Sequence, residues 1–236
     1  MENEIFKYRS WYSLFTTAMV HVTVNCNLEC RYCFVKQEPH MMETETIYNI
    51  IDLLAKNYYE KNEMLGNVFV NNGEKCCLVF FGGEPLLGYD NIIVKGVEYA
   101  NEMYPNLFEY SITTNGTLLT KEKVDFIYKN NFSIILSIDG DKETQDFNRP
   151  CKNGESSFDK LMENLPYILE KYPNLSFRST ISREKCNKLF ENYLFAESLG
   201  FRNFFCVPDH LNLNWTKEEM DILGKELKKI FEYRID

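Results

Sequence analysis

Three cysteines stand close together near the start of the chain, in the stretch NCNLECRYCF. Cys26, Cys30 and Cys33 have the spacing C-x3-C-x2-C, so one loop can present three thiolates to a single inorganic centre. Thiolates are soft ligands that favour zinc or iron–sulfur clusters. A structural zinc ion needs four protein ligands, and only His21 or His40 stands nearby in the sequence as a fourth. Three thiolates on a four-iron cluster would instead leave one iron open to a substrate or cofactor.

The segments that must position this loop are short strands that alternate with amphipathic helices. Each expected strand is rich in β-branched or aromatic residues and ends near Gly, Pro, Asn or Asp. The six strands are Met19–Asn25, Cys76–Phe81, Phe108–Thr114, Ser133–Asp139, Ser176–Ser182 and Asn203–Val207. Six βα units predict a parallel sheet covered by helices. At this level, a partial barrel and a doubly wound sheet both remain open.

Apolar residues at helical spacing fill the intervals between the strands, for example Ile47, Ile51 and Leu54. Two helix starts can also be read from capping residues. Thr216 and Glu219 form a capping box ahead of a last helix over 216–235. Thr120 is placed to open the helix that follows the third strand.

One face of the expected strands is small and polar. Its residues are Ser111 and Thr113 in the third strand, Ser133, Ile135, Ser137 and Asp139 in the fourth, and Ser176, Arg178, Thr180 and Ser182 in the fifth. A closed eight-stranded barrel fills its interior with branched apolar side chains, so this pattern predicts a lumen that holds water or ligand. An antiparallel sheet with one wet face is the alternative, but the helical stretches between the strands favour parallel crossovers.

Length and composition exclude several classes of protein. The chain has 236 residues, which corresponds to one or two domains, and 44% of them are hydrophobic. A net charge of −9 argues against nucleic-acid binding. Neither a membrane span nor a signal peptide is recognisable. Eight cysteines without a secretory signal predict a reducing, cytoplasmic setting. Five of these cysteines are scattered and are expected to be small buried hydrophobes: Cys76, Cys77, Cys151, Cys186 and Cys206.

The cysteine spacing, with Tyr32 before the last cysteine, resembles the C-x3-C-x-aromatic-C signature of the radical S-adenosylmethionine (SAM) superfamily. The resemblance implies one [4Fe–4S] cluster held by Cys26, Cys30 and Cys33, with SAM on its open iron. It also implies an α/β fold, the partial (βα)6 TIM-like barrel of this family. One core domain over 1–236 is then expected, with an N-terminal extension over 1–16, the strands within 17–207 and the last helix.

Further segments resemble cofactor-binding motifs of the same superfamily. GGEP after the second strand implies contact of Gly83 and Glu84 with SAM, and the TNGT segment implies contact of Asn115. The S-x-D-G segment and the arginine downstream of it imply contact of Ser137 and Arg149 with SAM. Val207 in the sixth strand is expected to pack on the adenine.

These motifs are closest to the sulfatase-maturase and peptide-modifying branch. They imply hydrogen abstraction from a peptide or protein side chain, with an electron donor such as flavodoxin or ferredoxin. Asp209 and His210 are weak candidates for a substrate-side role. That branch usually carries a cysteine-rich C-terminal domain with auxiliary clusters, and no such segment follows the sixth unit here. A glycyl-radical-enzyme activase and a non-catalytic module that binds cofactor or peptide are the alternatives.

Overall fold

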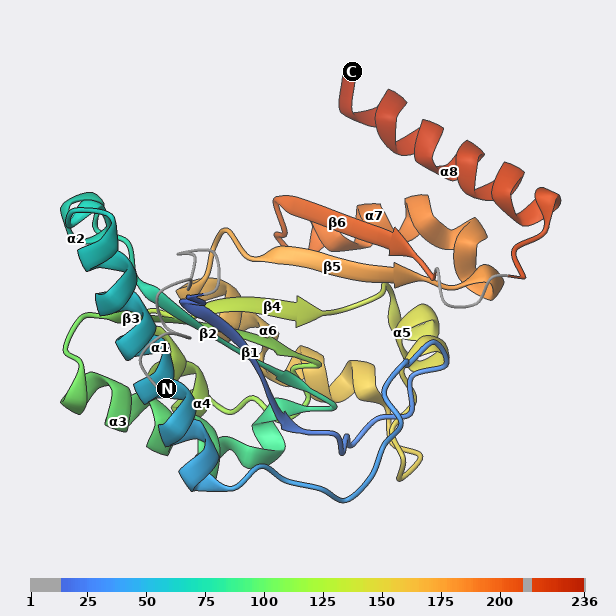
Figure 1. Ribbon diagram of the computed structural model, residues 1–236. Coiled ribbons are helices and arrows are strands. Elements are labelled where there is room, and N and C mark those ends of the chain that lie inside the picture. Colours follow the sequence, from blue (N-terminus) through green and yellow to red (C-terminus); the bar gives the residue numbers. More distant parts are fainter. Residues whose placement is uncertain (1–13, 210–213, 236) are drawn as a thin grey trace. The chain divides into compact units, whose positions relative to one another are not determined.

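The computed structural model describes residues 14–209 and 214–235, which form two compact units (Figure 1). The first unit contains residues 14–25, 38–112 and 129–133. The second unit contains the remaining described residues, 26–37, 113–128, 134–209 and 214–235. Strand and helix alternate throughout both units, as the sequence predicts. Most of the expected N-terminal extension lies outside the described residues.

The first unit is built on parallel strands β1 (Thr17–Thr23), β2 (Cys76–Gly82) and β3 (Phe108–Thr114), which neighbour one another in chain order. Val20 pairs with Phe80, and all three strands bury alternate apolar residues. The helical segments between them are α1 (Thr44–Met64), α2 (Val68–Asn72), η3 (Pro85–Gly88), η4 (Tyr89–Val94) and α3 (Lys95–Met103). Helix α1 packs on β1, β2 and α3 through a buried stripe that includes Ile47, Ile51 and Leu54.

Strand β1 ends two residues earlier than predicted, because the side chain of Thr23 closes it. The register with β2 shifts between His21 and Thr23. The Thr23 hydroxyl then accepts a hydrogen bond from the Asn25 N–H at 3.0 Å and donates one to the carbonyl of His40. These side-chain bonds replace ladder bonds and turn the chain out of the sheet.

The second unit is built on parallel strands β4 (Ser133–Ser137), β5 (Ser176–Ile181) and β6 (Asn203–Pro208), again in chain order. Its helical segments are α4 (Lys121–Lys129), α5 (Lys142–Asn148), α6 (Ser157–Lys171), η5 (Arg183–Lys188), α7 (Leu189–Ser198) and α8 (Lys217–Ile235). Helix α8 packs on α7 and η5. No helix among the described residues is long and apolar enough to cross a membrane.

The predicted alternation of faces is confirmed in this unit. Leu136, Phe177 and Ile181 are buried on one face. On the other face, the register aligns Ser137 with Arg178 and Arg178 with Phe205. Two residues further along the strands on the same face, Thr180 aligns with Val207. The polar face therefore contains apolar residues contributed by β6.

Both predicted helix starts are confirmed. Thr216 N–H donates to the Glu219 carboxylate at 2.7 Å, and Glu219 N–H donates to the Thr216 hydroxyl at 3.2 Å. The Thr120 hydroxyl accepts from Lys123 N–H at 3.4 Å at the start of α4. These local pairings need only residues three apart, which is why the sequence is sufficient to find them.

Candidate functional site

The cysteine loop, residues 26–37, belongs to the second unit and runs from a buried end to an exposed one. Cys26 is 8% exposed and packs with Leu28 and Cys151, with Cys30 beside them. Cys33 is exposed. The prediction of a small buried cysteine at Cys151 is confirmed, but its position against the loop is not evident from its spacing in the sequence.

The buried half of the loop is paired with the segment 148–152, which follows α5. Leu28 and Cys151 form an antiparallel bridge. Three backbone hydrogen bonds extend it, from Glu29 N–H to Pro150 at 2.9 Å, from Arg31 N–H to Asn148 at 2.9 Å and from Lys152 N–H to Asn27 at 3.2 Å. The loop therefore has its own short ladder, which holds its backbone in place.

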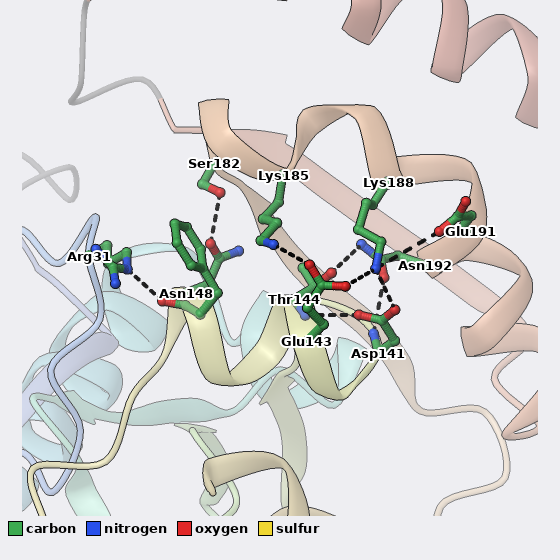
Figure 2. A network of polar contacts seen from close by, with 11 residues as sticks. Arg31, Asp141, Glu143, Thr144, Asn148, Ser182, Lys185, Lys188, Glu191 and Asn192 are labelled. Carbon is green, nitrogen blue, oxygen red and sulfur yellow. Dashed lines mark hydrogen bonds and ion pairs between the residues drawn. The ribbon is translucent and has the colours of Figure 1, made fainter. Parts of the chain in front are cut away.

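Arg31 adds side-chain contacts to the same attachment (Figure 2). Its Nε donates to the carbonyl of Phe147 at 2.7 Å, and its guanidinium lies 4.1 Å from the centre of the Phe147 ring. Helix α5 is held in turn by η5, because Lys185 and Lys188 both form ion pairs with Glu143 (Figure 2). Glu143 is thus the shared ion-pair partner of both lysines.

Asp139 is the hub that joins the loop to the sheet. Its fully buried carboxylate accepts from Arg149 Nη2 at 3.0 Å and from Thr180 N–H at 2.9 Å. The hydroxyl of Tyr32, on the cysteine loop, donates to the other carboxylate oxygen. Burial raises the pKa of Tyr32, and the Asp139 charge raises it further. Burial opposes the charge on Arg149, yet Asp139 holds the pKa of that guanidinium above its ordinary value.

Gln145 supports Asp139, although no motif in the sequence indicates this role. It is fully buried, and its Oε1 accepts from the Asp139 N–H at 2.8 Å. This bond replaces a strand bond, so β4 ends at Ser137, two residues earlier than predicted. A glutamine in the first turn of a helix carries no distinctive sequence signal, because only the fold brings its side chain back to the end of β4.

Several buried donors near this hub have no hydrogen-bond partner among the described residues. They are Gln145 Nε2, Asn148 Nδ2 and Arg149 Nε. Unpaired buried donors are costly, and a bound group with acceptor oxygens would satisfy them. Asn148, together with Asp139, Thr180 and Ser182, also lines a small hollow. The unpaired donors therefore fit a ligand group with acceptor oxygens, such as the carboxylate of SAM.

The thiols differ in their electrostatic surroundings. Cys26 Sγ accepts from Leu28 N–H at 3.4 Å, and Asn115 Nδ2 lies 3.8 Å from it. Burial raises the pKa of Cys30 to about 12; Arg149 opposes this shift and Asp139 adds to it. A metal cluster would have to displace the protons of these thiols, since the thiolate is the ligand.

Among residues 14–209 and 214–235, no group of three or more His, Cys, Asp or Glu side chains could hold a single metal ion. The zinc alternative, with His21 or His40 as a fourth ligand, therefore gains no support. A cluster makes a different demand, because each cysteine binds its own iron atom rather than converging on one ion. Three thiols along one anchored loop fit that demand.

Gly83 and Glu84 belong to the first unit, where they meet the chain that leaves β1. Their N–H groups donate to the carbonyls of Thr23 and Asn25 at 2.7 and 2.9 Å. A Cβ at position 83 would lie 2.1 Å from the Asn25 oxygen, so glycine is required there. The buried Glu84 carboxylate accepts from Leu86 N–H at 3.0 Å and caps η3. Glu84 is extended, as its position before proline predicts.

The remaining predicted site residues lie at strand ends of the second unit. Ser137 is buried at the end of β4, and Val207 is half-buried on β6. Asp209 is buried; its N–H donates to Ile181 at 2.9 Å and its carbonyl accepts from Trp215 at 2.8 Å. These backbone contacts indicate an anchoring role. His210 lies outside the described residues.

Residues 20–184 match the Radical SAM superfamily, which is most of the chain. The chain belongs to this family. Its fold class is therefore the one predicted, a six-stranded parallel (βα)6 sheet with alternating helices. As a radical SAM chain it is an enzyme, and the family implies SAM and a [4Fe–4S] cluster as cofactors.

Known relatives of this radical SAM chain include a sulfatase-maturating enzyme and a cyclopropyl synthase. It is 30% identical over 192 residues to a cysteine-type anaerobic sulfatase-maturating enzyme of Clostridium novyi, covering 78% of this chain and 48% of that one. It is 28% identical to the radical SAM cyclopropyl synthase TigE of Paramaledivibacter caminithermalis, covering 91% of this chain and 46% of that one. The chain thus spans about half the length of these relatives.

Solved structures show the same fold. The native anSMEcpe with bound AdoMet and Cp18Cys peptide matches with a TM-score of 0.73 at 22% identity, over 92% of this chain and 59% of that one. Streptococcus suis SuiB bound to S-adenosylmethionine matches with a TM-score of 0.63 at 15% identity, over 93% of this chain and 48% of that one. The radical SAM chain therefore shares its fold with these two solved proteins.

Proposed function

We propose that this protein reductively cleaves SAM and abstracts a hydrogen atom from a peptide or protein side chain. The observation that carries the proposal is the anchored cysteine loop. Its motif tyrosine, Tyr32, donates to Asp139, and Asp139 pairs with Arg149, whose Nε has no partner among the described residues. The loop that would hold the cluster and Arg149, which would contact the cofactor, are thus parts of one buried network.

The residues of the chain have distinct roles in this proposal. Cys26, Cys30 and Cys33 hold the [4Fe–4S] cluster, which together with SAM supplies a 5′-deoxyadenosyl radical when both are bound. Arg149 presents its unpaired Nε to a cofactor carboxylate, which suits a guanidinium. The other cofactor-contact positions remain those predicted from motifs: Tyr32, Gly83, Glu84, Asn115, Ser137 and Val207.

A peptide or protein substrate is supported by the relatives and by the inner face of the second unit. Ser137, Arg178 and Phe205 share one layer of that face. The Arg178 side chain has no hydrogen bond or ion pair with any described residue. Its guanidinium, next to the exposed ring of Phe205, is therefore available to a substrate. Such a surface can recognise polar and apolar groups of one extended chain. Flavodoxin or ferredoxin would supply the electron, and the cytoplasm would supply the reducing conditions.

The direct test is anaerobic reconstitution followed by incubation with SAM and dithionite. We expect 5′-deoxyadenosine to form slowly without substrate and faster with a substrate peptide. A peptide deuterated at the attacked carbon should transfer deuterium to 5′-deoxyadenosine, detected by mass spectrometry. Modification of a glycyl-radical enzyme only would favour the activase alternative. An intact cluster with no 5′-deoxyadenosine under any reductant would favour the non-catalytic alternative.

Cofactor binding can be tested separately from turnover. Loss of one charge-assisted contact costs about 1.5–3 kcal/mol, roughly a tenfold to hundredfold loss of affinity. We expect this loss in SAM affinity for Arg149→Ala, with the cluster retained. Arg183→Ala is the matched control, because Arg183 pairs with Glu219 away from the cysteine loop. Equal affinities in the two variants would remove Arg149 from the cofactor site.

A further inference from the structure

Two N–H donors lie near the sulfur of Cys26, which is also 4.0 Å from the side-chain oxygen of Asn27. The Leu28 N–H is 3.4 Å from Sγ, and the side-chain nitrogen of Asn115 is 3.8 Å from it. Both Cys26 and Asn115 are buried, with exposed fractions of 8% and 6%, so bulk water does not compete for these contacts. Cys33 differs, because it is exposed and its thiol faces the carbonyl of Val35, which cannot donate.

The orientation of the Asn115 amide is determined by its other contacts. The Thr117 N–H can only donate, and it points at one end of the amide at 3.0 Å, so that end is the oxygen. The other end is therefore the NH2 group, which carries two hydrogens. One is directed to Asn27 Oδ1 at 3.0 Å, and the second is available to Cys26 Sγ. These hydrogen bonds thus determine that the nitrogen of the Asn115 amide, and not its oxygen, faces the Cys26 sulfur.

The turn after Asn115 explains why the TNGT segment can hold this amide. Gly116 has a φ of +76°, a conformation that favours glycine. A Cβ there would also lie 2.6 Å from the side chains of Leu136 and Leu161. The Gly116 N–H donates to the Thr114 hydroxyl at 3.0 Å. These contacts fix the backbone at the end of β3, so the Asn115 side chain stays next to Cys26 of the cysteine loop.

We propose that Asn115 is a positioning residue that raises the reduction potential of the cluster through Cys26. The inference rests on the proposed function in one respect only, that the three cysteines hold a cluster. One-electron reduction, with the electron supplied by an external reductant, adds a negative charge that spreads onto the cluster sulfurs. A hydrogen bond to a ligand sulfur stabilises that added charge, so it favours the reduced state. This role requires no contact between Asn115 and SAM.

The test measures the midpoint potential of the reconstituted holoprotein without substrate, by redox titration followed by electron paramagnetic resonance. We expect Asn115→Leu to lower the reduction equilibrium constant about fivefold, the effect of one ordinary hydrogen bond. This change corresponds to a potential about 40 mV more negative. Asn115→Asp should shift the potential further in the same direction, because it keeps the acceptor for Thr117 but places a carboxylate beside the sulfur.

Thr117→Val is the matched control. It removes the hydroxyl contacts with Asn27 and Asn115 but leaves the Asn115 N–H facing Cys26. We expect its potential to equal that of the wild type. An unchanged potential in both Asn115 variants, or an equal shift in Thr117→Val, would overturn the inference. If Asn115→Leu fails to fold, the isosteric Asn115→Asp still decides the matter. A wild type without a four-iron cluster would refute the proposed function itself, which iron analysis shows beforehand.

Discussion

The two ends of the cysteine loop carry the same residue in very different surroundings. At Cys26 the chain is buried, paired with the segment 148–152, and supplied with N–H donors. At Cys33 the thiol is exposed and faces a carbonyl. One half of the predicted cluster site is thus built into the protein fold, whereas the other half is open to solvent. Under the proposed ligand assignment, cluster assembly would complete a partly formed site.

The largest expected effect is loss of the cluster, and we expect it for cysteines at both ends of the loop. Cys26→Ala, Cys30→Ala and Cys33→Ala should each abolish the cluster, because a [4Fe–4S] cluster with only two protein ligands is not retained. Iron and sulfide content and visible absorbance measure the outcome. Cys186→Ala is the control, since Cys186 is buried against α8 and should leave cluster content unchanged. Equal loss in the control would refute the three-ligand assignment.

Without the cluster, the thiols at the two ends of the cysteine loop should differ strongly in their rates of alkylation. Iodoacetamide reacts with thiolates, and burial holds the pKa of Cys30 at about 12. At pH 8 roughly one Cys30 thiol in ten thousand is ionised, and the labelling rate should rise about tenfold per pH unit. We expect pulse labelling and mass spectrometry to find Cys33 modified at least about tenfold faster than Cys30 or Cys26. Similar labelling rates at all three cysteines would contradict the conclusion that one half of the cysteine loop is already buried without the cluster.

The stability of the buried half of the cysteine loop should depend on the ion pair between Arg149 and Asp139. Arg149→Ala leaves the Asp139 charge buried and unpaired, which typically costs about 3–5 kcal/mol of unfolding free energy. Lys142→Ala breaks an exposed pair with Asp159 and should cost about 0–1 kcal/mol. Urea denaturation compares the two variants. A small cost for Arg149→Ala would mean that the hub does not stabilise the loop.

The smallest expected effect concerns the link between the loop and the hub. Tyr32→Phe removes one hydrogen bond to a buried carboxylate, for which we expect a loss of about 1.5–3 kcal/mol in unfolding free energy. Tyr167→Phe removes an exposed hydrogen bond to Asp125 and should cost less than about 1 kcal/mol. If the two variants are equally stable, the Tyr32 contact does not anchor the loop.

Local patterns in the sequence were sufficient to identify the cysteine motif, the alternation of strands and helices, and the capping box at Thr216 and Glu219. Each depends on residues a few positions apart, whose spacing is the same in the chain and in the fold. The alternation in β4 and β5 likewise predicted which residues face away from the helices, because side chains on a strand alternate between its two faces. The family resemblance joined these patterns into one fold.

The support for the site was decided only by the tertiary structure. Tyr32 and Asp139 are 107 residues apart in the chain, and Asn115 and Cys26 are 89 apart. No periodicity or motif indicates that these pairs meet, nor that Gln145 returns to the end of β4 or that Cys151 packs against the loop. Such contacts form because burying polar groups requires partners, and in a folded chain the partners are set by packing rather than by distance along the sequence.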